Sequence, residues 1–204
     1  MRTHLIWKWF ASAILAGHTA AKILQIDADI FLDLILFNLI LFAAIASLIR
    51  APLHSDPFAV SFTALAVTAW AIGSLSSSLI EFLNLNFDSV LFSNIAYSLF
   101  YPFAFIAIPR AINRGKRLQA IELLDSAIFG LGLSSIIAAL LLAKLVGNSS
   151  LGYFFSLLFA VCDIALIVIV LASSAITRLS LRLSLIIAGV LAFTATDFYF
   201  LWSQ

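Results

Sequence analysis

The stretch YFFSLLFAVCDIALIVIVLASSAIT, from Tyr153 to Thr177, contains a single charged residue, Asp163. A helix needs about 20 apolar residues to cross ~30 Å of hydrocarbon at ~1.5 Å per residue. Similar stretches, separated by short polar loops, occupy nearly all of the remaining chain. The predicted spans are residues 5–24, 30–49, 58–83, 90–108, 121–146, 153–177 and 183–202. The sequence therefore predicts an all-α membrane protein, with a single transmembrane domain over residues 1–204 built as a bundle of about seven helices.

The composition of the chain also indicates a membrane protein. The 204 residues are 64% hydrophobic and 10% charged, whereas a soluble domain carries about 25% charged residues. So few charges cannot cover a water-facing surface, and most of the exterior must therefore face lipid. A membrane β-barrel is excluded because its strands alternate apolar and polar residues, whereas these stretches are apolar on every side.

The first span is the least apolar, because it contains Lys8, His18 and Lys22. Lys8 and Lys22 lie near its ends, where their long side chains can reach the headgroups. A helix lying in the membrane interface is the alternative interpretation. Trp7 and Trp9 fall at the predicted membrane boundary and are expected to act as interface anchors.

Basic residues gather on one side of the predicted bundle and acidic residues on the other. Because basic loops stay cytoplasmic, the N-terminus is expected inside and Gln204 outside. The longest hydrophilic segment, residues 110–119, is predicted to anchor the chain at the anionic cytoplasmic headgroups. Its basic residues are Arg110, Arg114, Lys116 and Arg117. The expected location is a prokaryotic cytoplasmic (inner) membrane.

Small residues recur at four-residue intervals on two predicted spans. They are Ala69, Gly73 and Ser77 on the third span, and Ser126, Gly130 and Ser134 on the fifth. Such spacing lets helix backbones approach closely, and helix-packing seams are therefore predicted at Gly73, Ser77, Gly130 and Ser134. A polar substrate path is the alternative. Pro102, inside the fourth span, is predicted to kink that helix because it removes a backbone donor.

Ionisable residues inside a span cost about 2.5–3.5 kcal/mol each on insertion scales, and each therefore requires an explanation. The candidates for an outward-facing polar ligand pocket are His18, Lys22, Asp33, Asp163 and Asp197. The alternative is a set of buried pairs, such as Lys22 with an aspartate, or protonated aspartates bonded to serines. Asp163 and Asp197 lie on consecutive antiparallel helices joined by a short loop. Both are therefore predicted to face the bundle interior.

Signatures of catalysis and of cofactor binding are missing from the sequence. It has no GxSxG, no HExxH and no phosphate-binding glycine loop, and we expect neither an enzyme nor a bound cofactor. The single cysteine, Cys162, and the lack of HxxxH or HxxE spacing also argue against a metal site. No basic stretch is attached to a soluble fold, and nucleic acid is therefore not an expected partner.

The stretch from Asp88 to Ala143 resembles the multi-span membrane sensory regions that lie N-terminal to GGDEF and EAL domains in bacterial cyclic-di-GMP enzymes. Those regions have a polar entry, a Tyr-Pro pair, a basic loop and a Leu-Asp start to the next helix. The matching residues are Asp88, Tyr101, Pro102, Arg110, Arg114, Leu124, Asp125 and Ser126.

Two later helices are also similar to that family. Asp163 stands at the aspartate of a second Tyr-Pro-x-x-Asp helix, although Phe159 and Ala160 replace the Tyr-Pro pair. Asp197 and Tyr199 match the closing glycine-to-aspartate helix. The resemblance implies a signalling input module, but these 204 residues contain no output domain. An output domain acting on cytoplasmic nucleotides would need the C-terminus inside, which implies a further span or a stand-alone relative.

Three hypotheses of function come from these patterns. The first is a non-catalytic membrane sensory or signalling input module with a polar ligand pocket. The second is a structural or accessory subunit of a larger membrane complex, packed against partner membrane subunits. The third is a small proton-coupled transporter that uses Asp163. The expected partners are membrane lipids, together with further copies of the chain or partner subunits.

Overall fold

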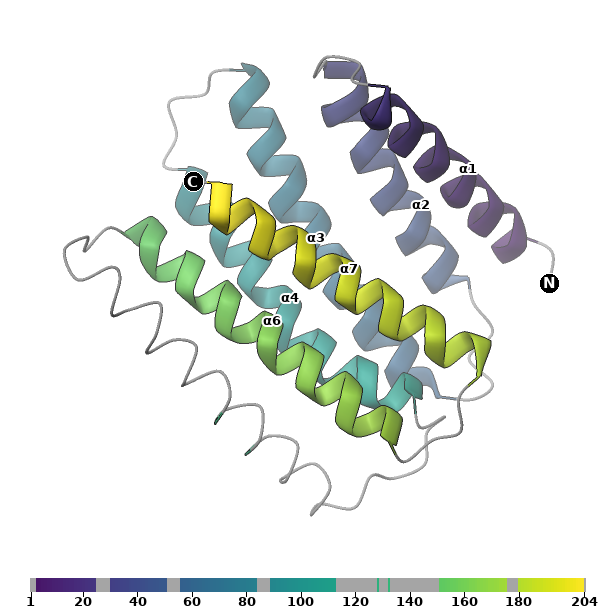
Figure 1. Cartoon of the computed structure of the whole chain (residues 1–204). Helices are drawn as coiled ribbons and strands as arrows, with labels where there is room; N and C mark the ends of the chain where they lie inside the picture. The colour runs from purple at the N-terminus through teal and green to yellow at the C-terminus, as the bar shows by residue number, and fades with distance from the viewer. Residues whose placement is uncertain are drawn as a thin grey trace. The chain divides into compact units, whose positions relative to one another are not determined.

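The computed structural model is built from α-helices and one π-helical segment (Figure 1). It describes residues 3–24, 30–50, 56–83, 89–112, 128, 132, 151–175 and 180–203. The elements are α1 (Thr3–Ile23), the π-helix η1 (Ile30–Leu36), α2 (Phe37–Ile49), α3 (Pro57–Leu83), α4 (Ser89–Ile112), α6 (Leu151–Ala175) and α7 (Leu181–Ser203). The predicted all-α class is confirmed for this part of the chain.

The observed helices follow the predicted spans closely, with two differences. The second predicted span, 30–49, is divided into η1 and α2. The fourth does not end at residue 108: α4 continues through Pro109 to Ile112. α4 is one helix across Pro102. The kink at Pro102 stays a prediction. The fifth predicted span, 121–146, lies outside the described residues except for Ile128 and Gly132, which are both helical.

Three of the described helices are long and apolar enough to cross a membrane, and the prediction of seven such spans is corrected accordingly. The qualifying segments are Pro57–Ile80, Leu91–Ile112 and Gly152–Ser174. The segments Leu34–Ile49 and Leu183–Phe198 are apolar but shorter. The second predicted span is divided between the π-helix η1 and the 13-residue α2, and α2 alone is too short to cross a membrane. In α1, the basic residues and His18 dilute the apolar run. The three long helices support an integral, multi-pass membrane protein.

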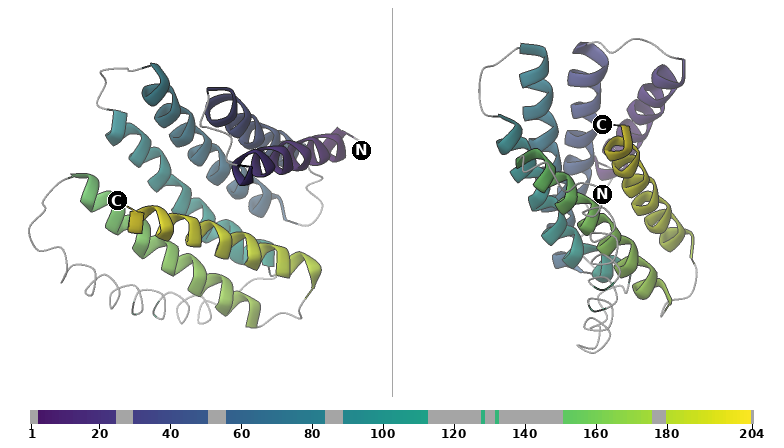
Figure 2. Two further views of the ribbon diagram at one scale, coloured as in Figure 1. Left: turned by 45° about the horizontal axis from the view of Figure 1, so that its top comes forward. Right: turned by 60° about the vertical axis from the view of Figure 1, so that its left-hand side comes forward.

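The chain separates into two compact units, Met1–Phe103 and Ala104–Gln204, each of which we describe by itself. In the first unit, α1 packs on α2 and α2 packs on α3, while η1 contacts all three of these helices. In the second unit, α6 and α7 lie side by side and run in opposite directions (Figures 1 and 2).

Polar side chains set the start of two helices. The Oδ1 atom of Asp56 accepts hydrogen bonds from the N–H groups of Phe58, at 3.0 Å, and Ala59, at 3.2 Å. Pro57 occupies the first helical position, where its missing N–H costs nothing. Ser180 performs the same role for α7, because its Oγ accepts from the N–H of Leu183 at 3.3 Å. These caps explain why α3 and α7 begin where the apolar runs begin.

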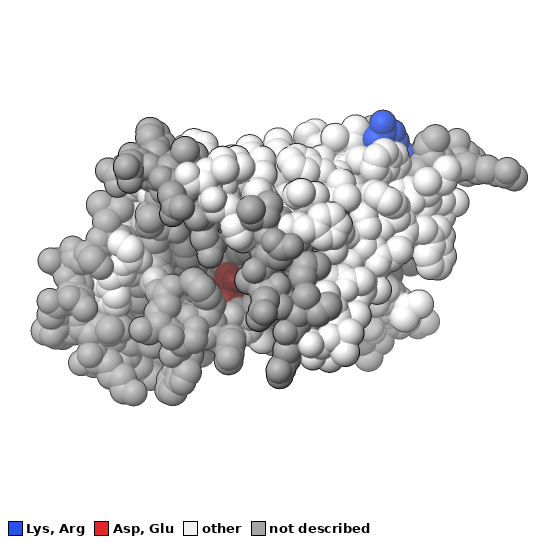
Figure 3. Space-filling model, turned by 90° about the horizontal axis from the view of Figure 1, so that it is seen from above, with Lys and Arg blue, Asp and Glu red and all other residues white. Residues whose placement is uncertain are grey.

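Apolar side chains form the interior of the second unit and much of the described surface of the chain. Ile112, Val170 and Leu183 make a buried cluster that joins the end of α4 to α6 and α7. Further apolar residues pack against it: Ile108, Ile186, Ile187 and Val190. In the view of Figure 3, the described surface is almost entirely free of Lys, Arg, Asp and Glu. Such a surface suits contact with lipid rather than water.

Candidate functional site

Among the described residues of the second unit, Asp163 is the most deeply buried ionisable group. It lies on α6, within the candidate span Gly152–Ser174, and its exposed fraction is 0%. Asp163 takes part in a further interaction within the structure. A carboxyl group inside a membrane helix is costly, and it therefore marks a functional-site candidate by default. The predicted inward orientation of Asp163 is confirmed.

Other polar side chains of α6 and α7 share this burial. Ser173 on α6 and Thr194 on α7 are 4% and 1% exposed, and Thr194 Oγ1 donates to the carbonyl of Leu191 at 3.2 Å. Asp197 is half-buried and lies three residues beyond Thr194, on the same face of α7. The helices that carry Asp163 and Asp197 were predicted to be neighbours. The contact between α6 and α7 confirms this prediction. We call Asp163 and Thr194, the buried polar residues near the middle of the two helices, the α6–α7 polar group.

The other predicted pocket residues belong to the first unit. His18 lies on α1 with its ring centroid 5.7 Å from that of Phe37. Lys22 lies one turn further along α1, and Asp33 lies in η1; their side chains are outside the described residues. Since α1 contacts η1, the structure brings together the elements that carry these three residues. A single pocket that joins them to Asp163 and Asp197 stays a prediction.

Asn38 is a buried polar residue of the first unit that the pocket prediction did not include. It is 3% exposed, and its Nδ2 donates to the carbonyl of Leu34 at 2.8 Å. This bond ties the first turn of α2 to η1, where the backbone changes from the i→i+5 to the i→i+4 pattern. Among the described residues, none donates to the buried Oδ1 atom of Asn38. Short π-helical segments occur often at functional sites.

We predict that Asn38→Ala loosens η1. The substitution removes the hydrogen bond to Leu34, which contributes about 1 kcal/mol. Amide hydrogen exchange over residues 30–36 should accelerate by about fivefold, the factor that corresponds to such a loss. Thr19→Ala is the control, because it removes an exposed bond of the same type, from Thr19 Oγ1 to the carbonyl of Leu15. Equal exchange over residues 30–36 in wild type and Asn38→Ala would contradict the prediction.

The packing seam between α3 and α4 follows a path that differs in part from the predicted one. Gly73 is buried, and a Cβ atom placed on it would lie 2.6 Å from Cδ1 of Tyr97. Ser77 is exposed, and the seam continues through Ser76, whose Oγ lies 3.0 Å from Ser93 Oγ. A strict four-residue step drifts by about 40° per turn on a helix of ~3.6 residues per turn, and this drift moves Ser77 off the contact face.

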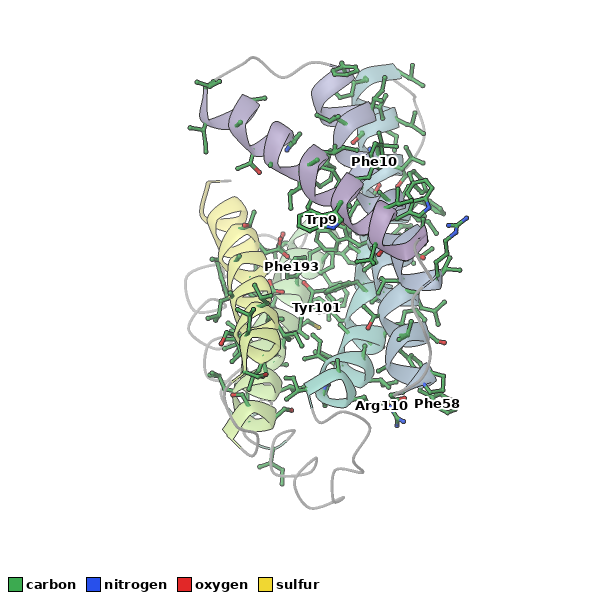
Figure 4. All side chains as sticks on the ribbon, turned by 90° about the vertical axis from the view of Figure 1, so that its right-hand side faces the viewer. Trp9, Phe10, Phe58, Tyr101, Arg110 and Phe193 are labelled. Carbon is green, nitrogen blue, oxygen red and sulfur yellow. The ribbon has the colours of Figure 1, made fainter. Side chains whose placement is uncertain are left out.

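Several predicted residues fall outside the part of the chain that the structure describes. These are Gly130, Ser134, Arg114, Lys116 and Arg117. Of the predicted cytoplasmic anchor, Arg110 is described: it is half-buried in the last turn of α4 (Figure 4). A basic residue there is favourable because the C-terminal end of a helix carries a partial negative charge.

The sequence signal that could have indicated Asn38 and Thr194 as buried polar residues is their polarity. Both are polar residues inside apolar runs, but being uncharged they stood out less than the aspartates. Tyr97 could not be recognised from its own position, because its contact with Gly73 depends on how α3 and α4 meet.

No family model, curated protein or solved structure matched the chain.

Proposed function

We propose that this chain is a non-catalytic membrane sensory or signalling input module of a prokaryotic cytoplasmic membrane. The observation that carries the proposal is the complete burial of Asp163 inside the apolar helix α6. A group that costs so much to place in a membrane is retained where it binds a ligand or couples helices. The resemblance to the input regions of cyclic-di-GMP enzymes, in which Asp163 matches an aspartate, points the same way.

A sensory module works by changing the balance between two helix arrangements. A ligand shifts that balance only through different affinities for the two arrangements. The α6–α7 polar group suits this role, since its side chains lie on two contacting antiparallel helices. A ligand that exchanges hydrogen bonds with Asp163 would alter how α6 and α7 pack. In the proposed orientation, the N-terminal end of α1 lies on the cytoplasmic side.

The proposal is tested by thermal unfolding of the purified protein with a panel of small polar compounds: amino acids, dicarboxylates and polyamines. A ligand that binds the folded state raises its stability according to its concentration and affinity, by about 2.7 kcal/mol at 100 times Kd. We expect at least one compound to raise the Tm of the wild type and to lose this effect in Asp163→Asn.

The control is Cys162→Ser, because Cys162 is adjacent to Asp163 and half-buried. This variant should keep the ligand response. If the compounds shift the wild type and Asp163→Asn equally, or shift neither, the sensory role of Asp163 is wrong. Proton flux into liposomes that stops in Asp163→Asn would instead favour a proton-coupled transporter.

The second candidate function is an accessory subunit of a membrane complex. The exposed face of α7 favours it, because Ala188, Gly189 and Ala192 lie there and a Cβ on Gly189 would meet nothing within 4 Å. Small residues of this kind allow another helix to approach closely. Extraction in a mild detergent separates the two functions. A stoichiometric assembly with other polypeptides would favour the subunit, whereas a monomer or homodimer would favour the sensor.

A further inference from the structure

One end of the α1–α2 pair carries an arginine whose guanidinium lies over the ring of a tryptophan. The Cζ atom of Arg50 lies 5.5 Å from the centroid of the Trp7 ring. Arg50 is exposed and follows the last residue of α2, and its backbone N–H donates to the carbonyl of Ala46 at 3.3 Å. The backbone of Arg50 is therefore fixed by the helix end, and its guanidinium is positioned by the ring. Among the side chains that the structure describes, no carboxylate pairs with Arg50.

The surface around this pair is apolar and strongly exposed. Ile6, Trp9 and Phe10 of α1 are 65%, 72% and 44% exposed, and Figure 4 shows Trp9 and Phe10 on α1. The ring of Phe10 also meets the edge of Trp7, with a centroid distance of 6.0 Å and an interplanar angle of 88°. Tryptophan beside exposed apolar residues is typical of the boundary between headgroups and acyl chains. A guanidinium beside such a boundary is within reach of the lipid phosphates.

We propose that Arg50 and Trp7 form a binding site for the phosphate of an anionic phospholipid. An arginine placed over an aromatic ring still has N–H groups available, and two of them can match two phosphate oxygens. Because the ring already restricts the rotation of the arginine side chain, binding costs less conformational entropy. The acyl chains of the same lipid would lie along Ile6 and Phe10. This site goes beyond the proposed sensory function and does not depend on it.

The test measures how the protein in phosphatidylcholine bilayers selects spin-labelled phosphatidylglycerol over spin-labelled phosphatidylcholine. The wild type should prefer phosphatidylglycerol. Arg50→Gln should lower the preference for phosphatidylglycerol, and Arg50→Lys should lower it by a smaller amount. Trp7→Leu, which changes no charge, should lower the preference by about two- to fivefold, the range expected for an exposed cation–π contact.

Two variants act as matched controls. Trp9→Leu removes a tryptophan from the same helix with no described cation over its ring, and Arg110→Gln removes an arginine from the end of α4. Trp9→Leu should keep the preference of the wild type, whereas Arg110→Gln, which removes a residue of the predicted headgroup anchor, should lower the preference by less than Arg50→Gln does. An equal decrease for Trp7→Leu and Trp9→Leu, or for Arg50→Gln and Arg110→Gln, would mean general anchoring or diffuse charge attraction and would overturn the site.

A free anion is the other source of the same chemistry. The 31P line width of inorganic phosphate is therefore measured with the protein in a non-ionic detergent. We expect no broadening that depends on Arg50, because a free phosphate lacks the acyl chains that the apolar surface binds. Broadening that disappears in Arg50→Gln would assign the site to free phosphate and overturn the lipid assignment.

Discussion

Gly73→Val is expected to lower the free energy of unfolding of the protein by about 1–3 kcal/mol, the usual cost of overpacking a well-packed interior. A Cβ at Gly73 would lie 2.6, 2.7 and 3.0 Å from three ring carbons of Tyr97. The ring has little room to move away, because its centroid lies 4.6 Å from that of Trp70. The measurement is unfolding in mixed micelles with increasing sodium dodecyl sulfate.

Gly189 provides the matched control for this experiment. It also lies in a helix, but a Cβ on it would meet nothing within 4 Å. Gly189→Ala should therefore leave stability unchanged or raise it by up to about 1 kcal/mol through helix propensity. In the double variant Gly73→Val/Tyr97→Ala, the cost of the valine should largely disappear because the obstructing ring is gone. A Gly73→Val protein as stable as the wild type would show that the seam between α3 and α4 is loosely packed.

Asp163→Leu is expected to have two opposing effects on the same helix. Removing a central carboxyl group should make insertion of α6 alone more favourable by about 2.5–3.5 kcal/mol. In the folded protein, the interaction that Asp163 makes would be lost. The loss of a buried polar partner costs about 1–3 kcal/mol, and the free energy of unfolding should therefore decrease.

The two effects are measured separately. A glycosylation assay in microsomes reports the insertion of α6, and sodium dodecyl sulfate titration reports the stability of the whole protein. Asp163→Asn should keep most of the stability, since the amide has nearly the same shape and still forms hydrogen bonds. A leucine variant that both inserts better and unfolds later would show that Asp163 is dispensable for packing.

The helices could be predicted from the sequence because their determinants are local. The apolar run and the preceding Asp56-Pro57 pair mark the start of α3, which begins within one residue of its predicted position. The division of the second span could not be predicted, because the apolar sequence of Ile30–Leu36 is as compatible with an α-helix as with a π-helix. The continuation of α4 through Pro109 was also missed, since the rule that proline ends a helix is only a tendency.

The candidate site could be predicted only in part, for a related reason. The burial of Asp163 was predictable because an isolated charge in an apolar run must avoid lipid. The exposure of Ser77 follows from the drift of a four-residue step along α3, whereas the contact of Ser76 with Ser93 depends on how α3 and α4 meet. Asn38 depends on the π-helical geometry of η1, and it was therefore recognised only when the backbone was known.

The hydroxyl groups of the helices also bear on the order of events during biosynthesis. The hydroxyls of Thr63 and Thr68 bond to carbonyls four residues earlier in their own helix, at 2.6 and 2.7 Å. A nascent helix with this arrangement can leave the translocon for the bilayer alone, since it carries few polar groups that still need a partner. The contact between Ser76 and Ser93 is different, because it forms only when α3 has met α4. The ribosome must therefore have delivered α4 before this contact exists, and its formation marks the step at which two separately inserted helices become a pair.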